Sequence, residues 1–291
     1  MKVLGLSLGI LSTAAISVNN KIISCSSEER FSRIKNDEQF PVKSIEFVLN
    51  EGNIKLGELD KVVIAGTSLN LNTHLMRKYS SWSISDHFRL MEEFWKPRLL
   101  KSESPNYNEI FKEKIDKKQF PGEKKWGQFL QTISNDYYDE KDNDKYKNFL
   151  HDMIVTTTGI EKRHIIHLDH HSCHAAYAYW ASPIRGQGTL IITGDAFGDG
   201  YSSTLSTIND KGNIECRHKV PADQFILGRL YRHITLLMAM MPDAHEYKIM
   251  GLAPYSKIET LKKAYDVFKE GMYVDGIDFK WKKRPSDLFF W

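Results

Sequence analysis

The stretch that decides the fold is VLGLSLGILSTAAISVNNKIISCS, residues Val3 to Ser26. Apolar and β-branched residues broken by glycine and serine predict strands at 3–7, 14–18 and 21–26. Asn19-Asn20 is typical of a two-residue hairpin turn, because asparagine tolerates the positive φ that such turns need. The sequence therefore predicts a β-meander at the start of the chain.

A second meander is predicted much later in the chain. Residues 189–193 form a buried strand, 194–200 a glycine-rich turn, and 201–208 with 214–220 a hairpin. The order strand, turn, strand, tight turn, strand and helix thus occurs twice, as in duplicated actin-like ATPases. We therefore predict an α/β protein with the duplicated actin-like, ribonuclease-H-like fold of the sugar-kinase superfamily.

The segment between the meanders is predicted to be helical. Apolar residues, many of them aromatic, recur at helical spacing in 85–95, 126–137 and 146–153. We expect the first helix to end at Pro97 and the third at Gly159. Periodic aromatic residues are more often core packing than the lining of a substrate pocket, and we favour core packing here.

This order of elements predicts three parts within one domain spanning 1–291. Residues 1–66 hold the first meander, 67–160 form a helical insertion, and 161–291 hold a metal motif and the second meander. The apolar ending Leu288 to Trp291 has the character of an interrupted core element. We therefore expect an actin-like domain that is truncated at its C-terminus.

Composition limits the classes of partner. The chain has a net charge of +3, with 41% hydrophobic and 26% charged residues, as in ordinary globular proteins. Such a charge predicts no nucleic-acid partner. The three cysteines have no CxxC spacing, which favours a reducing compartment. Because no apolar run approaches about 18 residues, and glycine and serine interrupt the apolar N-terminus, we predict a cytoplasmic protein without a membrane partner.

The densest chemical cluster is Asp169-His170-His171-Ser172-Cys173-His174. On a helix, His170 and His174 project from the same face, so both can bind one metal ion, while His171 points elsewhere. Asp195, at the end of the next strand, can add the carboxylate that divalent metals favour. The alternative is a set of polar residues that cap a helix, but the clustering favours ligands.

Glycines let backbone N–H groups approach a phosphate closely, and Gly194, Gly198 and Gly200 are candidates for such contacts. Turns of this composition are usually only hairpins, and the chain has no P-loop motif. The position in the repeat, where actin-like ATPases place their second phosphate loop, favours a phosphate contact.

Two charged clusters remain. Residues 246–255, EYKIMGLAPY, form a helix that Pro254 ends, in which Lys248 can contact a phosphate or pair with Glu246. The segment 28–37, EERFSRIKND, has the composition of a solvated charged surface.

Together these clusters resemble the N-terminal domain of the O-carbamoyltransferases that act on nodulation factors and antibiotics. The matching segments are Gly5–Gly9, Glu28–Arg33 with Lys35, Asp37, Phe40 and Pro41, His170–Ala176, Gly194–Gly200 and Glu246–Tyr255. The resemblance implies His170, His174 and Asp195 as metal-binding and catalytic residues. The nucleotide contacts it implies are Gly9, Gly194, Gly198, Gly200, Lys248 and Gly251.

The resemblance also implies a reaction. A separate C-terminal domain, supplied in cis or in trans, would make carbamoyl-adenylate from carbamoyl phosphate and ATP. The present domain, with bound Fe or Zn, would transfer the carbamoyl group to a hydroxyl of a sugar-like or secondary-metabolite acceptor. Since half of the cleft is expected to be missing, the chain alone is not expected to complete the transfer, and homo-oligomers are a further expectation.

One departure keeps other functions open. Where we align a His-Asp pair in the family, this chain has Ile10-Leu11, which can neither accept a proton nor bond to a hydroxyl. A degenerate, non-catalytic actin-like nucleotide-binding module is therefore the main alternative. A threonylcarbamoyl-transferase-like or sugar-kinase-like ATPase is another, in which Asp195 or Asp199 would be the catalytic aspartate of a kinase.

Overall fold

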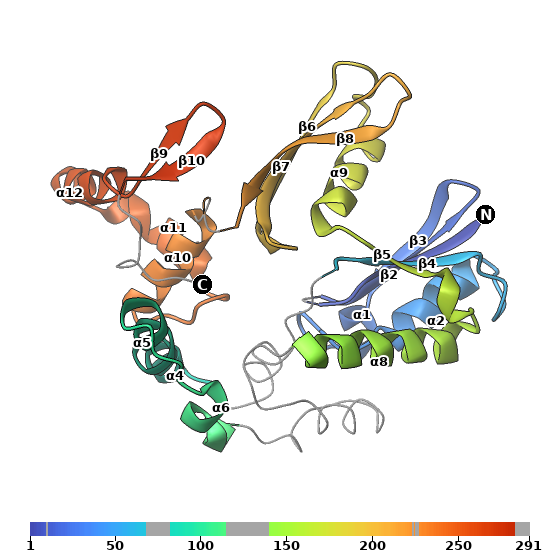
Figure 1. Ribbon diagram of the computed structural model, residues 1–291, viewed down its shortest axis with the longest axis horizontal. Helices are drawn as coiled ribbons and strands as arrows, with labels where there is room; N and C mark the ends of the chain where they lie inside the picture. Colours follow the sequence, from blue (N-terminus) through green and yellow to red (C-terminus); the bar gives the residue numbers. More distant parts are fainter. Residues whose placement is uncertain (10, 68–81, 115–139, 223, 225–226, 283–291) are drawn as a thin grey trace. The chain divides into compact units, whose positions relative to one another are not determined.

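The computed structural model describes residues 1–9, 11–67, 82–114, 140–222, 224 and 227–282 (Figure 1). The chain forms two compact units, here called the first and the second unit. The first unit comprises Met1–Leu71, Gly122–Ser134 and Tyr138–Arg185, and the second comprises Asn72–Pro121, Asn135–Tyr137 and Gly186–Trp291. The predicted division at residues 66 and 160 stays a prediction.

A five-stranded mixed sheet forms the centre of the first unit. Its strands are β1 (Lys2–Ser7), β2 (Thr13–Val18), β3 (Lys21–Ser27), β4 (Lys61–Ala65) and β5 (Ile165–Leu168). They lie in the order β3-β2-β1-β4-β5, with β1, β2 and β3 antiparallel and β1, β4 and β5 parallel. The predicted first meander is confirmed, and both turn residues have positive φ, 50° at Asn19 and 65° at Asn20.

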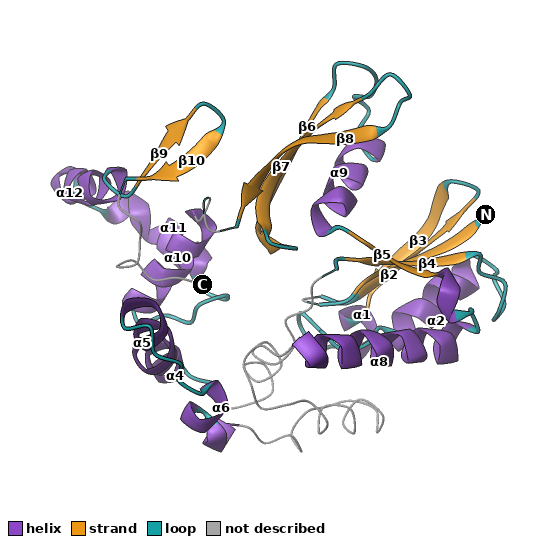
Figure 2. Ribbon diagram, viewed as in Figure 1, coloured by secondary structure: helices purple, strands orange, loops and turns teal. Residues whose placement is uncertain are grey.

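Helices cover one face of this sheet, where Figure 2 shows α2 and α8 together. The described helices of the first unit are α1 (Glu29–Ser32), α2 (Val42–Glu51), α8 (Glu140–Thr158), the 3₁₀-helix η4 (Lys162–His164) and α9 (His170–Trp180). Alternate side chains of the strands pack against one face of α2 and form the core. Its fully buried members include Leu4, Ile16, Ile45, Val48, Val62 and Ile64. As predicted, α8 ends at Gly159, which has a φ of 71°.

An antiparallel three-stranded sheet belongs to the second unit. It consists of β6 (Leu190–Gly198), β7 (Tyr201–Ile208) and β8 (Ile214–Pro221), in that order. The predicted hairpin is confirmed, but the prediction of a turn over Gly194–Gly200 is wrong. Strand β6 continues to Gly198, and only Asp199 and Gly200, with φ of 50° and 88°, form the turn. A bulge explains the difference, because the register of β6 with β7 shifts between Gly194 and Gly198.

The other elements described in the second unit are mostly helical. They are α4 (Ile84–Arg89), the π-helix η1 (Leu90–Trp95), α5 (Lys96–Leu100), α6 (Tyr107–Ile110), η2 (Lys112–Lys114), α10 (Leu227–Leu237), α11 (Glu246–Leu252), η5 (Ala253–Tyr255), α12 (Ile258–Lys269) and the hairpin β9 (Met272–Asp275) with β10 (Asp278–Trp281). The predicted helix end at Pro97 is wrong. Pro97 lies in the first turn of α5, where its missing N–H costs no hydrogen bond.

Phe94 and Trp95 of the helix at 85–95 pack into a buried aromatic cluster, which confirms the core interpretation for these two residues, whereas Phe88 is 37% exposed. Phe94 is fully buried, with its ring centroid 5.3 Å from that of Tyr107 and 4.9 Å from that of Trp95. Trp82 and Phe111 add a further tilted pair at 4.7 Å. Edge-to-face and tilted contacts of this kind stabilise a core beyond the area they bury.

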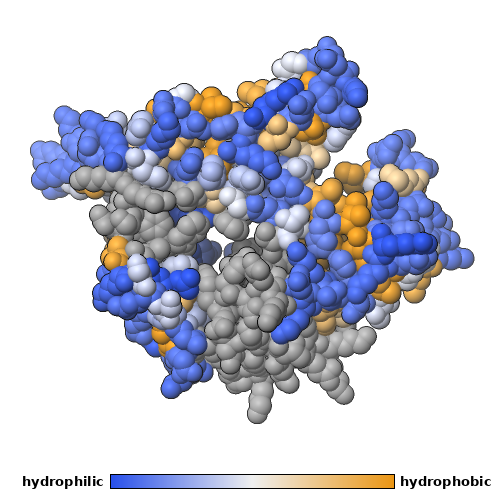
Figure 3. Space-filling view, in the orientation of Figure 1, coloured by the Kyte–Doolittle hydropathy of each residue, from blue (hydrophilic) through white to orange (hydrophobic). Residues whose placement is uncertain are grey.

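The surface is largely hydrophilic on the face drawn in Figure 3, with hydrophobic side chains in separate patches. In the described part of the chain, no helix has both the length and the apolar character needed to cross a bilayer.

The predicted helix at 126–137, the ending Leu288–Trp291 and Ile10 lie outside the described residues. A mixed α/β architecture is therefore confirmed, whereas the duplicated actin-like fold and its truncation stay predictions.

Candidate functional site

The start of α9 is fixed by a side-chain cap. The Asp169 carboxylate accepts hydrogen bonds from the Ser172 backbone N–H at 2.8 Å and from its hydroxyl at 2.9 Å. This cap lets the helix begin directly after β5, so His170 is the first helical residue. The capping alternative thus holds for Asp169 and Ser172.

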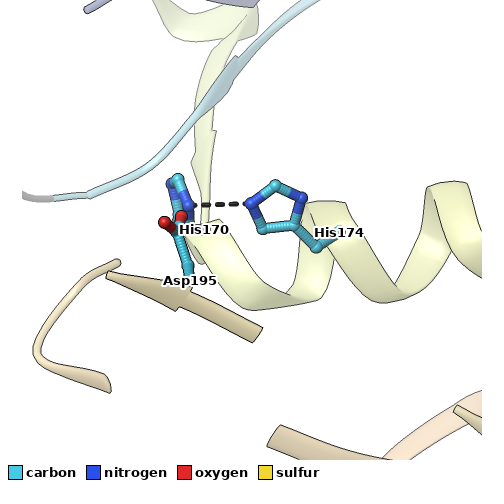
Figure 4. A group of neighbouring side chains, drawn as sticks. All are labelled: His170, His174 and Asp195. Carbon is cyan, nitrogen blue, oxygen red and sulfur yellow. Dashed lines mark hydrogen bonds between the residues drawn. The ribbon is translucent and has the colours of Figure 1, made fainter. Parts of the chain in front are cut away.

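His170 and His174 face each other across one turn of α9. Figure 4 shows their rings turned toward each other, with the two Nε2 atoms 2.9 Å apart and the ring centroids 4.6 Å apart. Two nitrogens at this separation can each lie about 2.0–2.1 Å from a single zinc ion. His170 is half-buried and His174 is exposed, so solvent reaches the pair. His171 is buried, as expected for a histidine that points away from the ligand face.

Asp195, which Figure 4 also labels, comes from β6 in the second unit. It is half-buried, and its Oδ1 accepts a hydrogen bond from the Ala196 N–H at 2.6 Å. Each of His170, His174 and Asp195 offers one atom that can bind a metal. That the carboxylate completes a site with the two imidazoles stays a prediction.

The glycines predicted to contact nucleotide lie in different elements. Gly194 and Gly198 are in β6 and Gly200 is in the turn after it. Gly9 follows β1 in the first unit, and Gly251 is in α11. At Gly9, Gly194, Gly200 and Gly251, an added Cβ would meet no heavy atom within 4 Å, so a ligand can approach the backbone there.

Lys248 is a half-buried residue of α11. Its Nζ lies 5.9 Å from the centroid of the Tyr247 ring. Within the described residues no ion pair joins Lys248 to Glu246, whose carboxylate instead accepts the Asp243 N–H at 2.7 Å. The surface-pair alternative is therefore not supported, and the phosphate contact stays a prediction.

The charged segment 28–37 is only partly a solvated surface, because Arg30 and residues 33–36 are exposed but Glu28 and Asp37 are buried. Glu28 is 6% exposed and Asp37 is 1% exposed. The Glu28 carboxylate accepts the backbone N–H groups of Lys43 at 3.2 Å and of Ser44 at 2.8 Å, at the start of α2. Pro41, the N-cap residue of α2, has no side chain that can cap the helix. In the sequence, a helix that starts directly after a proline has no side-chain cap of its own. This indicates that an acceptor from elsewhere in the chain must bind its first backbone N–H groups.

A second pair of imidazoles lies in the first unit, between α8 and β5. The His167 Nδ1 is 3.0 Å from the Gly66 carbonyl oxygen, which can only accept, so this nitrogen carries the proton. The His167 Nε2 therefore accepts a hydrogen bond from the His151 Nε2, 2.9 Å away. Burial, followed by the neighbouring imidazole of His167, holds the pKa of His151 below its ordinary value.

This depressed pKa predicts acid destabilisation of the first unit. The unfolded chain takes up the His151 proton at a higher pH than the folded chain, so stability is full above about pH 6.5 and decreases as the pH falls through the folded pKa. Urea unfolding at a series of pH values measures this. We expect a flatter profile for His151→Gln than for His164→Gln, and equal profiles for the two variants would contradict the assignment.

Comparison with known proteins gives one family and two relatives. The family model described as carbamoyltransferase N-terminus matches residues 2–286. Uncharacterized protein sll1178 of Synechocystis sp. is 27% identical over 246 residues, covering 84% of this chain and 33% of that protein. Uncharacterized protein MJ1058 of Methanocaldococcus jannaschii is 30% identical over 118 residues, covering 35% of this chain and 19% of that protein. The chain thus aligns with a third or less of each relative's length.

Proposed function

Because the chain belongs to the carbamoyltransferase family and matches its N-terminal part, we propose that it is the transfer module of an O-carbamoyltransferase. In this proposal the module moves the carbamoyl group of carbamoyl-adenylate to a hydroxyl of a sugar-like or secondary-metabolite acceptor. The observation that carries the proposal is the convergence of the His170 and His174 Nε2 atoms, 2.9 Å apart, on one exposed helix face. A pair arranged in this way fits a divalent metal, Fe or Zn.

In the proposed site, His170, His174 and Asp195 would hold the metal, the histidines through Nε2 and the aspartate through a carboxylate oxygen. When bound, the metal would supply a Lewis acid to polarise the carbamoyl carbonyl and neutralise phosphate charge. The acceptor oxygen forms a bond to the carbamoyl carbon, the bond from that carbon to the phosphate oxygen breaks, and AMP leaves with the electron pair. The second oxygen of Asp195 is the proposed acceptor of the hydroxyl proton.

Nucleotide contacts in the proposal come from the backbone of glycine residues and from one cation. The backbone at Gly9, Gly194, Gly198, Gly200 and Gly251 contacts the adenylate, and Lys248 adds a charged hydrogen bond to phosphate. Carbamoyl-adenylate itself comes from carbamoyl phosphate and ATP in an adenylate-forming domain, supplied in cis or in trans in the cytoplasm. The open backbone beside Gly194, Gly200 and Gly251 supports this part of the proposal.

Reconstitution tests the proposed function. The purified chain is mixed with carbamoyl phosphate, ATP, a panel of hydroxyl acceptors and a separately expressed adenylate-forming domain, and carbamoylated products are sought by mass spectrometry. We expect product only when both proteins are present, and none with Asp195→Asn. Nucleotide binding without product from any acceptor would instead identify a non-catalytic nucleotide-binding module. Product formed by this chain alone from preformed carbamoyl-adenylate would show that the module is self-sufficient.

Replacing Lys248 with methionine is expected to weaken binding of ATP or AMP by about 1–3 kcal/mol, the range for losing a charge-assisted hydrogen bond. Methionine keeps most of the side-chain length, so the change removes the charge with little effect on packing. Isothermal titration calorimetry measures the affinity. Lys263→Met, at an exposed lysine of α12, is the matched control. Equal affinities for the two variants would remove Lys248 from the nucleotide site.

A further inference from the structure

Asp195 lies in the bulge of β6. Gly194 pairs with Ser203 and Gly198 pairs with Tyr201, so residues 195–197 together oppose the single residue Ser202 of β7. A bulge leaves its extra residues without ladder partners and redirects their side chains, which is why bulges often adjoin active sites. The direction of the Asp195 carboxylate therefore depends on what holds residues 195–197 in place.

The base of the bulge is held by buried hydroxyl contacts between the strands. The Thr193 hydroxyl lies 2.7 Å from that of Thr204, and the Ser203 hydroxyl donates to the Thr193 carbonyl at 2.7 Å. On the far side, the Ala222 N–H donates to the Gly200 carbonyl at 3.0 Å. These contacts fix the two ends of the bulge but not the peptide groups within it.

Arg229 holds the interior of the bulge. Its Nη2 donates to the carbonyl oxygen of Ala196, the residue directly after Asp195, at 2.9 Å. Arg229 is half-buried and lies in the first turn of α10, where a cation is unfavourable because helix N-termini carry partial positive charge. Arg229 therefore does not stabilise α10 through the helix dipole. Its hydrogen bond to the Ala196 carbonyl in the bulge gives a reason for an arginine at this position.

We propose that Arg229 is a positioning residue, which holds the β6 bulge and so fixes the direction of the Asp195 carboxylate. The Ala196 N–H donates to Asp195 Oδ1 at 2.6 Å, and the Ala196 carbonyl accepts from Arg229 at 2.9 Å. Ala196 is thus bonded on both sides, and the carboxylate is linked to α10 through one residue. This inference rests on the proposed function, in which Asp195 binds the metal.

A double-mutant cycle on zinc affinity tests the inference. Zn²⁺ binding is measured by competition with a chromophoric chelator for Arg229→Leu, Asp195→Asn and the double variant. We expect Arg229→Leu to lower the affinity about 10–100-fold, the effect of losing an interaction that orients a ligand. In the Asp195→Asn background, the same change should alter the affinity less than about twofold, because the residue through which it acts is gone. Arg229→Lys, which keeps a donor, should recover most of the affinity.

One control variant and the Asp195→Asn single variant separate the outcomes. Arg232→Leu, on the same helix, removes an arginine whose Nε lies 2.9 Å from Asp243 Oδ1, and should leave zinc affinity unchanged. Additive losses in the cycle, or an equal loss for Arg232→Leu, would contradict the positioning role and leave the proposed metal site intact. If Asp195→Asn alone leaves zinc affinity unchanged, Asp195 is not a ligand and the proposed metal site fails instead.

Discussion

Replacing His170 with alanine is expected to lower zinc affinity at least about 100-fold, since losing a ligand costs more than losing a group that only orients one. The two Nε2 atoms lie 2.9 Å apart, so each imidazole supplies half of the nitrogen pair. One imidazole and one carboxylate hold the ion more weakly against water than the full set of three ligands. His174→Ala should have the same effect, and the double variant should bind no stoichiometric metal.

Elemental analysis of protein purified without chelator, followed by Zn²⁺ titration, measures this loss. His164→Ala is the matched control, because His164 is half-buried in η4 just before β5 and belongs to no proposed site. Circular dichroism should show that the variants keep their helices, since His174 is exposed. Unchanged metal content in the double variant would refute the assignment of these histidines as ligands.

Short-range patterns were sufficient to predict much of the fold. The meander at 3–26 follows from local alternation and an asparagine turn, and the end of α8 follows from Gly159. The bulge in β6 was missed because it depends on the register of a partner strand, which no local pattern of β6 contains. Without knowledge of this register, the glycines of 194–198 were interpreted as a turn, whereas the chain continues as strand β6 to Gly198.

The candidate site divides in the same way. The spacing of His170 and His174 is a property of one helix turn, so the sequence predicted that they share a face. Arg229 was missed because its partner, Ala196, is 33 residues earlier and offers only a backbone carbonyl, which any residue type has. Glu28 was missed because charge composition predicts exposure, while its burial depends on the uncapped helix start at 42–44.

Glu28→Ala is expected to destabilise the first unit by about 3 kcal/mol, the cost of leaving the buried Ser44 N–H and the part-buried Lys43 N–H without their charged acceptor. The carboxylate accepts from Lys43 N–H at 3.2 Å and from Ser44 N–H at 2.8 Å, and Ser44 is fully buried. Water therefore cannot replace the acceptor at Ser44. The negative charge also lies at the positive end of the α2 dipole, which adds to the loss.

Glu28→Gln separates the charge from the shape. The glutamine amide fills nearly the same volume, but it has only one oxygen to accept from the two N–H groups. Its NH₂ group, which is a donor, then faces the second N–H group. We therefore expect most of the loss in free energy of unfolding to persist. Glu46→Ala is the matched control, because Glu46 is an exposed residue of the same helix. Urea unfolding gives the free energy, and hydrogen exchange at the Ser44 amide reports the helix start directly. Faster exchange at Ser44 in Glu28→Gln, with Glu46→Ala unchanged, would establish the acidic segment as the cap of α2. Wild-type exchange in Glu28→Gln would show that the carboxylate has no capping role, and its burial would then require another cause.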